Sequence, residues 1–181
     1  WSYYDKELVH KIAAESGLAD SYILDSGEYA CSTNSFLFNW AMSAESGRNP
    51  GTLPVSDQLY IVQNNVIRDL ADKGSCVIVG RCADVILKDY HPLNLFVYAD
   101  AESKIQRCID RAPEGEHLSR NDIARRMKQV DKNRAQYRQM FADTKWGVKE
   151  TYHLCVNTSG HQIKNLIPGL ASFVRCWYGE K

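Results

Sequence analysis

The sequence predicts an α/β protein built on a mostly parallel sheet. Three short apolar runs carry this prediction, at residues 76–79, 95–98 and 154–156. None of them alternates between apolar and polar side chains, which is typical of strands covered on both faces. Helical segments lie between the runs, and buried strands that alternate with helices favour parallel pairing.

The composition fits one globular domain. The 181 residues are 44% hydrophobic, which is enough for a sizeable core. The 22 basic and 22 acidic side chains give a formal net charge of zero, so no overall field attracts nucleic acid or anionic lipid. No apolar run approaches the roughly 18 residues of a membrane span. We therefore expect a cytoplasmic protein with no nucleic-acid and no membrane partner.

The spacing of cysteines and histidines gives no indication of a metal site. The six cysteines are scattered without a Cys-x-x-Cys pair, and the five histidines form no His-x-x-x-His pair. This pattern favours buried, reduced thiols over disulfides or metal ligands.

Apolar periodicity predicts five helices, at residues 5–16, 57–73, 101–112, 119–141 and 161–177. Leu8 and Ile12 fall on one face of the first helix. Asp57 is a candidate N-cap for the second helix, and Gly74 is a suitable stop for it. The last helix is expected to be kinked or broken at Pro168. Residues 30–56 contain a loop signal and are expected to be the least rigid part of the chain.

Polar side chains follow several of the predicted strands. Asp5 comes after the short apolar start of the chain, Arg81 and Asp84 follow the run at 76–79, and Asn157 follows the last run. Parallel sheets bind ligands at the carboxyl ends of their strands. The guanidinium group of Arg81 is suited to bidentate contact with phosphate oxygens. Alternatively, Arg81 neutralises a neighbouring carboxylate, either Asp84 or Asp5.

The predicted helix at 119–141 is strongly basic, and it begins with a capping-box-like pair, Ser119 and Asp122. It carries seven basic and two acidic side chains in a protein with no net charge. A solvated helix face is one explanation. Clamping of phosphate groups and binding of nucleic acid are the functional alternatives.

Taken together, several segments resemble the cytidylate kinase-like family from residue 1 to about residue 160. They occur in the order and at the spacing of that family, at residues 4–8 (YDKEL), 74–84 (GSCVIVGRCAD), 130–134 (VDKNR), 145–147 (KWG) and 154–159 (LCVNTS). The Val-Gly-Arg-Cys-Ala-Asp sequence within the second segment is the most specific of these, and the others are weak individually.

The resemblance implies a P-loop NTPase fold, a parallel sheet with helices on both faces and a helical lid. It implies a single kinase-like domain over residues 1–181, with residues 30–56 as an insert on the acceptor side and residues 119–141 as the lid helix. The implied activity is transfer of the γ-phosphoryl group of ATP, with Mg²⁺, to a small acceptor. The implied acceptor is a nucleoside monophosphate such as CMP.

The resemblance also implies roles for particular residues. Asp5, Arg81 and Asp84 correspond to the side that binds the acceptor, where the arginine contacts its phosphate or base. Cys82 stands where authentic cytidylate kinases have an acidic residue, a departure that bears on cytosine recognition.

On the lid helix, Asp131 and Arg134 match an aspartate and an arginine that approach the nucleotide, and we expect catalytic roles for both. Arg126 is a third catalytic candidate because it lies near a further lid arginine of these enzymes. The formal match to that arginine is Met127, one position later.

A glycine-rich phosphate loop, Gly-x-x-x-x-Gly-Lys-Ser/Thr, does not occur in these 181 residues. In the family this loop precedes the Tyr-Asp-Lys segment, and its strand lies between those at 76–79 and 94–98. Our interpretation is that the sequence is incomplete at its amino end. The alternative is a catalytically inactive binding protein of the same fold. Either way, we expect the strands at 76–79, 94–98 and 154–157 to run parallel in one sheet, with a break between the first two.

Overall fold

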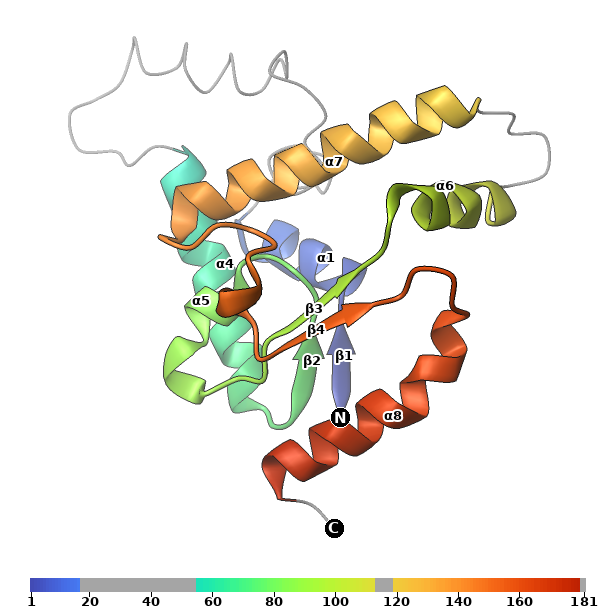
Figure 1. The fold of residues 1–181 in the computed structure, drawn as a ribbon. Helices are drawn as coiled ribbons and strands as arrows, with labels where there is room; N and C mark the ends of the chain where they lie inside the picture. The colour runs from blue at the N-terminus through green and yellow to red at the C-terminus, as the bar shows by residue number, and fades with distance from the viewer. Residues whose placement is uncertain (17–54, 113–118, 180–181) are drawn as a thin grey trace, which may run out of the picture. The chain divides into compact units, whose positions relative to one another are not determined.

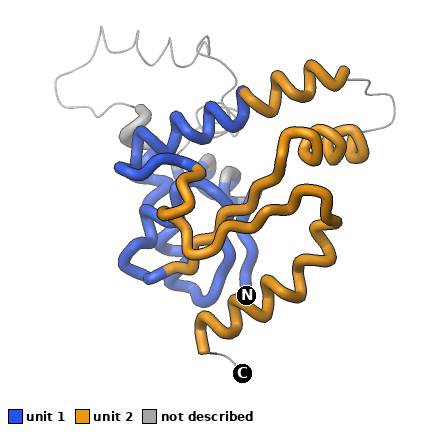
Figure 2. Tube along the Cα trace, viewed as in Figure 1, with its two compact units in different colours: residues 1–91, 129–146 blue, residues 92–128, 147–181 orange. Residues whose placement is uncertain are grey.

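The structure of the chain is a computed structural model that describes residues 1–16, 55–112 and 119–179 (Figure 1). The expected insert at residues 30–56 lies outside the described residues, except for its last two. The chain divides into two compact units (Figure 2). Unit 1 contains residues 1–91 and 129–146, and unit 2 contains residues 92–128 and 147–181. Strands and helices alternate along the chain, which confirms the α/β class.

Unit 1 contains a parallel pair of short strands, β1 (Ser2–Tyr4) and β2 (Cys76–Ile78). Tyr4 lies opposite Ile78 in the ladder, and the N–H of Val79 donates to the carbonyl of Tyr4 at 3.0 Å. The two strands therefore end together, so the residues that follow them emerge at the same edge.

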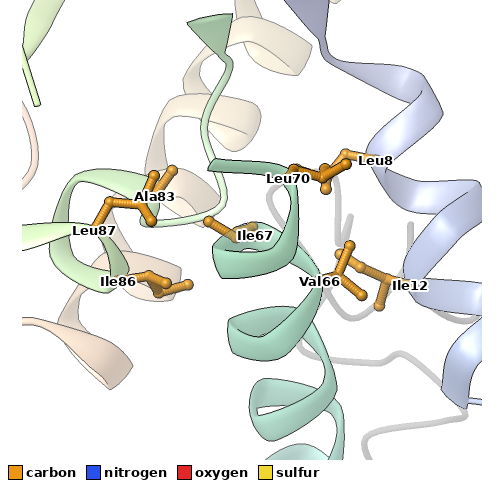
Figure 3. Close-up of a cluster of buried hydrophobic side chains, with 8 residues drawn as sticks. All are labelled: Leu8, Ile12, Val66, Ile67, Leu70, Ala83, Ile86 and Leu87. Atoms are coloured by element: carbon orange, nitrogen blue, oxygen red, sulfur yellow. The ribbon is translucent and has the colours of Figure 1, made fainter. Parts of the chain in front are cut away.

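Two helices of unit 1, α1 (Lys6–Ser16) and α4 (Val55–Asp72), form its core together with the short helix α5 (Ala83–Ile86) (Figure 3). The core consists of eight buried side chains: Leu8, Ile12, Val66, Ile67, Leu70, Ala83, Ile86 and Leu87. Spacings of three and four residues place the members from α1 and α4 on one stripe of each helix. A 3₁₀ helix, η2 (Lys88–Tyr90), ends this part of the unit.

Unit 2 contains a second parallel pair, β3 (Leu95–Tyr98) and β4 (Leu154–Asn157). Its helices are α6 (Ala101–Asp110) and α8 (Ile163–Tyr178), with a 3₁₀ helix, η3 (Lys149–Thr151), before β4. Gly147 adopts a φ of +76°, and a Cβ there would lie 3.3 Å from the ring of Phe96. This position therefore requires glycine for both its backbone angle and its space.

Helix α7 (Arg120–Phe141) corresponds to the predicted basic helix. Its expected cap is confirmed, because the Ser119 hydroxyl accepts from the N–H of Asp122 at 3.1 Å and donates to the Asp122 carboxylate at 2.6 Å. Residues up to 128 belong to unit 2, and the remainder belong to unit 1.

The strand predictions are confirmed in position and in parallel direction, but two expectations are wrong. The four strands form two separate two-stranded sheets rather than one, because β2 pairs with β1 and β3 with β4. Within the described residues β2 and β3 share no ladder. Across the described ranges the strands are also not covered on both faces, since Val77 is 44% exposed and Val97 is 56% exposed.

Two helix predictions are also corrected. Asp57 lies inside α4, which already includes Val55, so it does not cap that helix. Helix α8 continues through Pro168 instead of breaking there. Proline removes only one backbone donor, the one that would reach the carbonyl of Lys164, and the side chain at 164 is exposed. No described residue of α8 is fully buried, so solvent can satisfy that carbonyl.

The described cysteines are all free thiols, as expected. Their predicted burial holds for Cys82 alone, since Cys76 and Cys155 are partly exposed and Cys108 and Cys176 are exposed. Burial raises the pKa of the Cys76 thiol. In the part of the chain that the structure describes, no helix has the length and apolar character needed to cross a membrane.

Candidate functional site

The carboxyl edge of β1 and β2 brings two predicted site residues together. Asp5 directly follows β1, and Arg81 lies three residues after β2. Because the strands end in register, both residues leave the sheet at this edge. Arg81 is only 4% exposed, whereas Asp5 is partly exposed and accepts a hydrogen bond from the Tyr3 hydroxyl at 3.3 Å.

Arg81 lies in an unusual left-handed turn, which we call the Arg81 turn (residues 80–82). Gly80, Arg81 and Cys82 have φ angles of 72°, 57° and 52°. Glycine adopts this conformation freely, but for the other two residues it costs roughly 1–2 kcal/mol each. The turn closes through the N–H of Ala83, which donates to the carbonyl of Gly80 at 3.1 Å. Such strain persists only where the surroundings hold the backbone, and it is concentrated at functional sites.

A buried glutamine holds this turn. Gln63 of α4 is 2% exposed, and its Nε2 donates to the carbonyl of Arg81 at 3.0 Å. Its Oε1 accepts from the hydroxyl of Tyr137 on α7 at 2.7 Å. We call this chain of two hydrogen bonds the Gln63 relay. Sequence reasoning missed it, although one signal existed, because Gln63 is a polar residue within the apolar stripe of α4.

Asp84 and Arg138 form a second connection between α5 and α7. The guanidinium donates to both carboxylate oxygens, at 2.8 and 3.2 Å, and also to the carbonyl and hydroxyl of Thr144. The two side chains are 20% and 6% exposed, respectively. The carboxylate of Asp84 therefore pairs with Arg138, and the alternative that Arg81 neutralises Asp84 or Asp5 stays a prediction. Contact of Asp84 with a substrate stays a prediction.

The predicted catalytic residues of α7 lie in different surroundings. Arg134 and Asp131 form an ion pair at 3.2 Å, and each side chain keeps about a third of its surface exposed, 33% and 30%. The pair joins two residues three positions apart on the same helix. Arg126 is exposed and belongs to unit 2, so the structure does not group it with the other candidates.

Asn133, next to Arg134, carries an unsatisfied polar group. Its side chain is 6% exposed, and its Oδ1 accepts from Nε2 of Gln129 at 2.8 Å. Its Nδ2 has no hydrogen-bond partner among the residues that the structure describes. A buried donor without a partner costs about 1–3 kcal/mol.

The other strand edge, at the ends of β3 and β4, holds a network of hydrogen bonds. The backbone N–H and hydroxyl of the buried Thr158 both donate to the carbonyl of Tyr98, at 2.8 and 3.0 Å. Arg107 donates to the hydroxyl of Thr158 at 3.0 Å and also to its carbonyl. Asp100 caps α6 by accepting from the N–H of Ser103, which lowers the pKa of its carboxyl. Within this network Thr158, the first residue after β4, joins the strands to α6.

The features that hold a donor nucleotide and its metal ion were sought in the sequence and in the described residues. The sequence has no glycine-rich loop to hold its phosphates. Across residues 1–16, 55–112 and 119–179 there is no group of three potential metal ligands.

Comparison with known proteins finds a matching family model and a similar solved structure. The model of the cytidylate kinase-like family matches residues 1–160. A solved structure, an uncharacterized protein from Eubacterium ventriosum ATCC 27560, is 30% identical with a TM-score of 0.58, and the match covers 66% of this chain and 74% of that one. No curated protein matches. With its α/β fold, its parallel strand pairs and its match over most of its length, the chain belongs to the cytidylate kinase-like family.

Proposed function

We propose that this protein is a phosphotransferase that moves the γ-phosphoryl group of ATP to a nucleoside monophosphate such as CMP. The observation that carries the proposal is the buried Arg81, held in a strained turn at the carboxyl edge of β1 and β2. Ligands of parallel sheets bind at this edge, and a guanidinium group is the side chain best suited to a phosphate dianion. The family match favours a nucleotide as the ligand.

In the proposed mechanism Arg81 binds and orients the phosphate of the acceptor. The burial of its side chain strengthens the interaction, because a charge-assisted hydrogen bond is stronger where water is excluded. Asp5 at the same edge is placed to accept a hydrogen bond from the acceptor. Catalysis of phosphoryl transfer depends mainly on such positioning and on neutralisation of charge.

Helix α7 supplies the second set of groups. Arg134 is proposed to leave its part-buried ion pair with Asp131 and to stabilise the charge on the transferred group. Asp131 holds the guanidinium in place until then. ATP brings the phosphoryl group, and Mg²⁺ would neutralise its charge when both are bound.

The alternative function is nucleotide binding without turnover. The absence of a glycine-rich loop from the sequence favours it, because that loop provides the N–H groups that hold the donor phosphates. Both functions share the acceptor site at Arg81, and they differ only in whether product forms.

The experiment is an assay of nucleoside diphosphate formation from ATP, Mg²⁺ and each nucleoside monophosphate in turn. We expect phosphorylation of CMP in preference to the purine monophosphates. Arg134→Ala should lower kcat at least tenfold with a smaller change in KM, because the arginine serves the transition state. Binding of CMP without product would support the alternative. Absence of both binding and product would overturn the proposal.

A further inference from the structure

We propose that Gln63 and Tyr137 are positioning residues that set the geometry of Arg81 and link it to the helix that carries Arg134. The inference rests on the proposed function for its catalytic meaning, but its structural part stands alone. Neither residue belongs to the segments that carry the family resemblance. Both are identified from hydrogen bonds that span 18 and 74 residues of sequence.

The first step concerns the conformation of Arg81. Two consecutive residues other than glycine adopt left-handed angles, which neither residue type favours. Without an external constraint, the turn would relax towards more favourable backbone angles and carry the Arg81 side chain with it. The amide of Gln63 donates directly to the Arg81 carbonyl, within the strained segment. It therefore holds the backbone at the residue whose side chain is proposed to bind phosphate.

The second step concerns the orientation of Gln63. An amide has a donor end and an acceptor end, and a flip exchanges them. The carbonyl of Arg81 can only accept, so the Nε2 end of the amide must face it. The hydroxyl of Tyr137 donates to the Oε1 of Gln63 at 2.7 Å, and so it holds the other end of the amide in place. The hydroxyl thus acts on Arg81 through Gln63, without being required to touch a substrate.

The third step concerns the position of Tyr137 on α7. It lies three residues after Arg134, close to one helical turn. Displacement of this part of the helix would move Arg134 and would stretch the bond from Tyr137 to Gln63. The Gln63 relay therefore couples the Arg81 turn to the position of the Arg134 guanidinium.

The test compares two variants that each remove one hydroxyl. Tyr137→Phe removes the donor of the relay but keeps the ring, whose centroid lies 5.0 Å from that of Phe141. Tyr60→Phe is the matched control, because the Tyr60 ring stacks on the same Phe141 at 4.2 Å. Both variants should keep the packing around Phe141, so both are expected to fold.

The first measurement needs no ligand. Amide hydrogen exchange is followed at Ala83, Val85 and Ile86, whose N–H groups donate to the carbonyls of Gly80 and Cys82. Tyr137→Phe should accelerate exchange at these amides at least fivefold, whereas Tyr60→Phe should leave it unchanged. Equal exchange in the two variants would overturn the relay, whatever the protein catalyses.

The second measurement uses CMP and calorimetry. Tyr137→Phe should weaken binding of CMP about tenfold, and Tyr60→Phe should not. The double variant Arg81→Ala/Tyr137→Phe should bind no more weakly than Arg81→Ala, because the hydroxyl acts through Arg81. Additive losses would show that Tyr137 acts independently and would contradict the inference. If the wild-type protein binds no monophosphate, the proposed function fails, and the exchange experiment alone decides the relay.

Discussion

Different kinds of interaction stabilise the interior of each unit. Unit 1 buries eight apolar side chains in one cluster, with the Arg81 turn and its polar contacts at the margin. In the described part of unit 2 the buried apolar side chains are Ile105 and Ile123, and hydrogen bonds around Thr158 join its elements. Apolar burial is not directional, whereas each hydrogen bond depends on both partners. The strained turn of the candidate site is therefore held by a few directional hydrogen bonds at the margin of an apolar core.

The largest expected effect comes from the apolar cluster of unit 1. Ile67→Ala should lower the free energy of unfolding by about 2–5 kcal/mol, because it leaves a cavity between fully buried neighbours. Val97→Ala in β3 of unit 2 is the control, and with its exposed side chain it should change stability by no more than about 0.5 kcal/mol. Urea denaturation measures both. Similar losses from the two variants would contradict the distinction between the units.

The next effect comes from the buried ion pair in unit 1. Arg138→Met should lower the free energy of unfolding by about 3–5 kcal/mol, because it leaves the carboxylate of Asp84 largely buried without its bidentate partner. The double variant Asp84→Leu/Arg138→Met should recover most of the loss, since it removes both charges. Thermal and urea unfolding measure the cycle. A double variant as unstable as the single one would mean that the pair itself, rather than the unpaired charge, determines stability.

A smaller effect is expected from the hydrogen-bond network of unit 2. Thr158→Val keeps the shape of the side chain but removes its bonds to Tyr98 and Arg107. It should lower stability by about 1–2 kcal/mol, because the carbonyl of Tyr98 and the guanidinium of Arg107 each lose one hydrogen bond. Thr151→Val, at the end of η3, is the control and should be close to neutral. Equal unfolding midpoints for the two variants would contradict the role given to the network.

The smallest effect is a pH dependence at the start of α6. The Ser103 N–H lowers the pKa of Asp100 below its ordinary value of 3.8 in the folded state. The stabilisation is therefore present above that value and is lost as the pH falls through the lowered folded pKa. Asp100→Asn keeps a capping oxygen but cannot titrate. Between pH 5 and pH 2 the Tm of the wild type should fall more steeply than that of the variant, and parallel curves would contradict this.

Local patterns in the sequence predicted much of the fold but little of the site's support. The spacing of Leu8 and Ile12 predicts a buried helix face. The pair Gly80-Arg81 after an apolar run predicts an arginine at a strand end. The exposure of Val97 is not predictable in this way, because it depends on what covers the strand. The Gln63 relay and the Asp84–Arg138 pair are not predictable from local patterns either, because their partners are distant in sequence and meet only in the tertiary fold.

The most direct test of the central claim is calorimetric titration of CMP into the wild-type chain and into Arg81→Ala. If Arg81 binds the acceptor phosphate, the variant should lose about 2–4 kcal/mol of binding free energy, the range for removing one partner of a buried charged pair. The free energy of unfolding of the variant should change by much less than this. Arg175→Ala, which removes an exposed arginine on α8, is the matched control and should bind as the wild type does. Equal affinity in Arg81→Ala and the wild type would contradict the account.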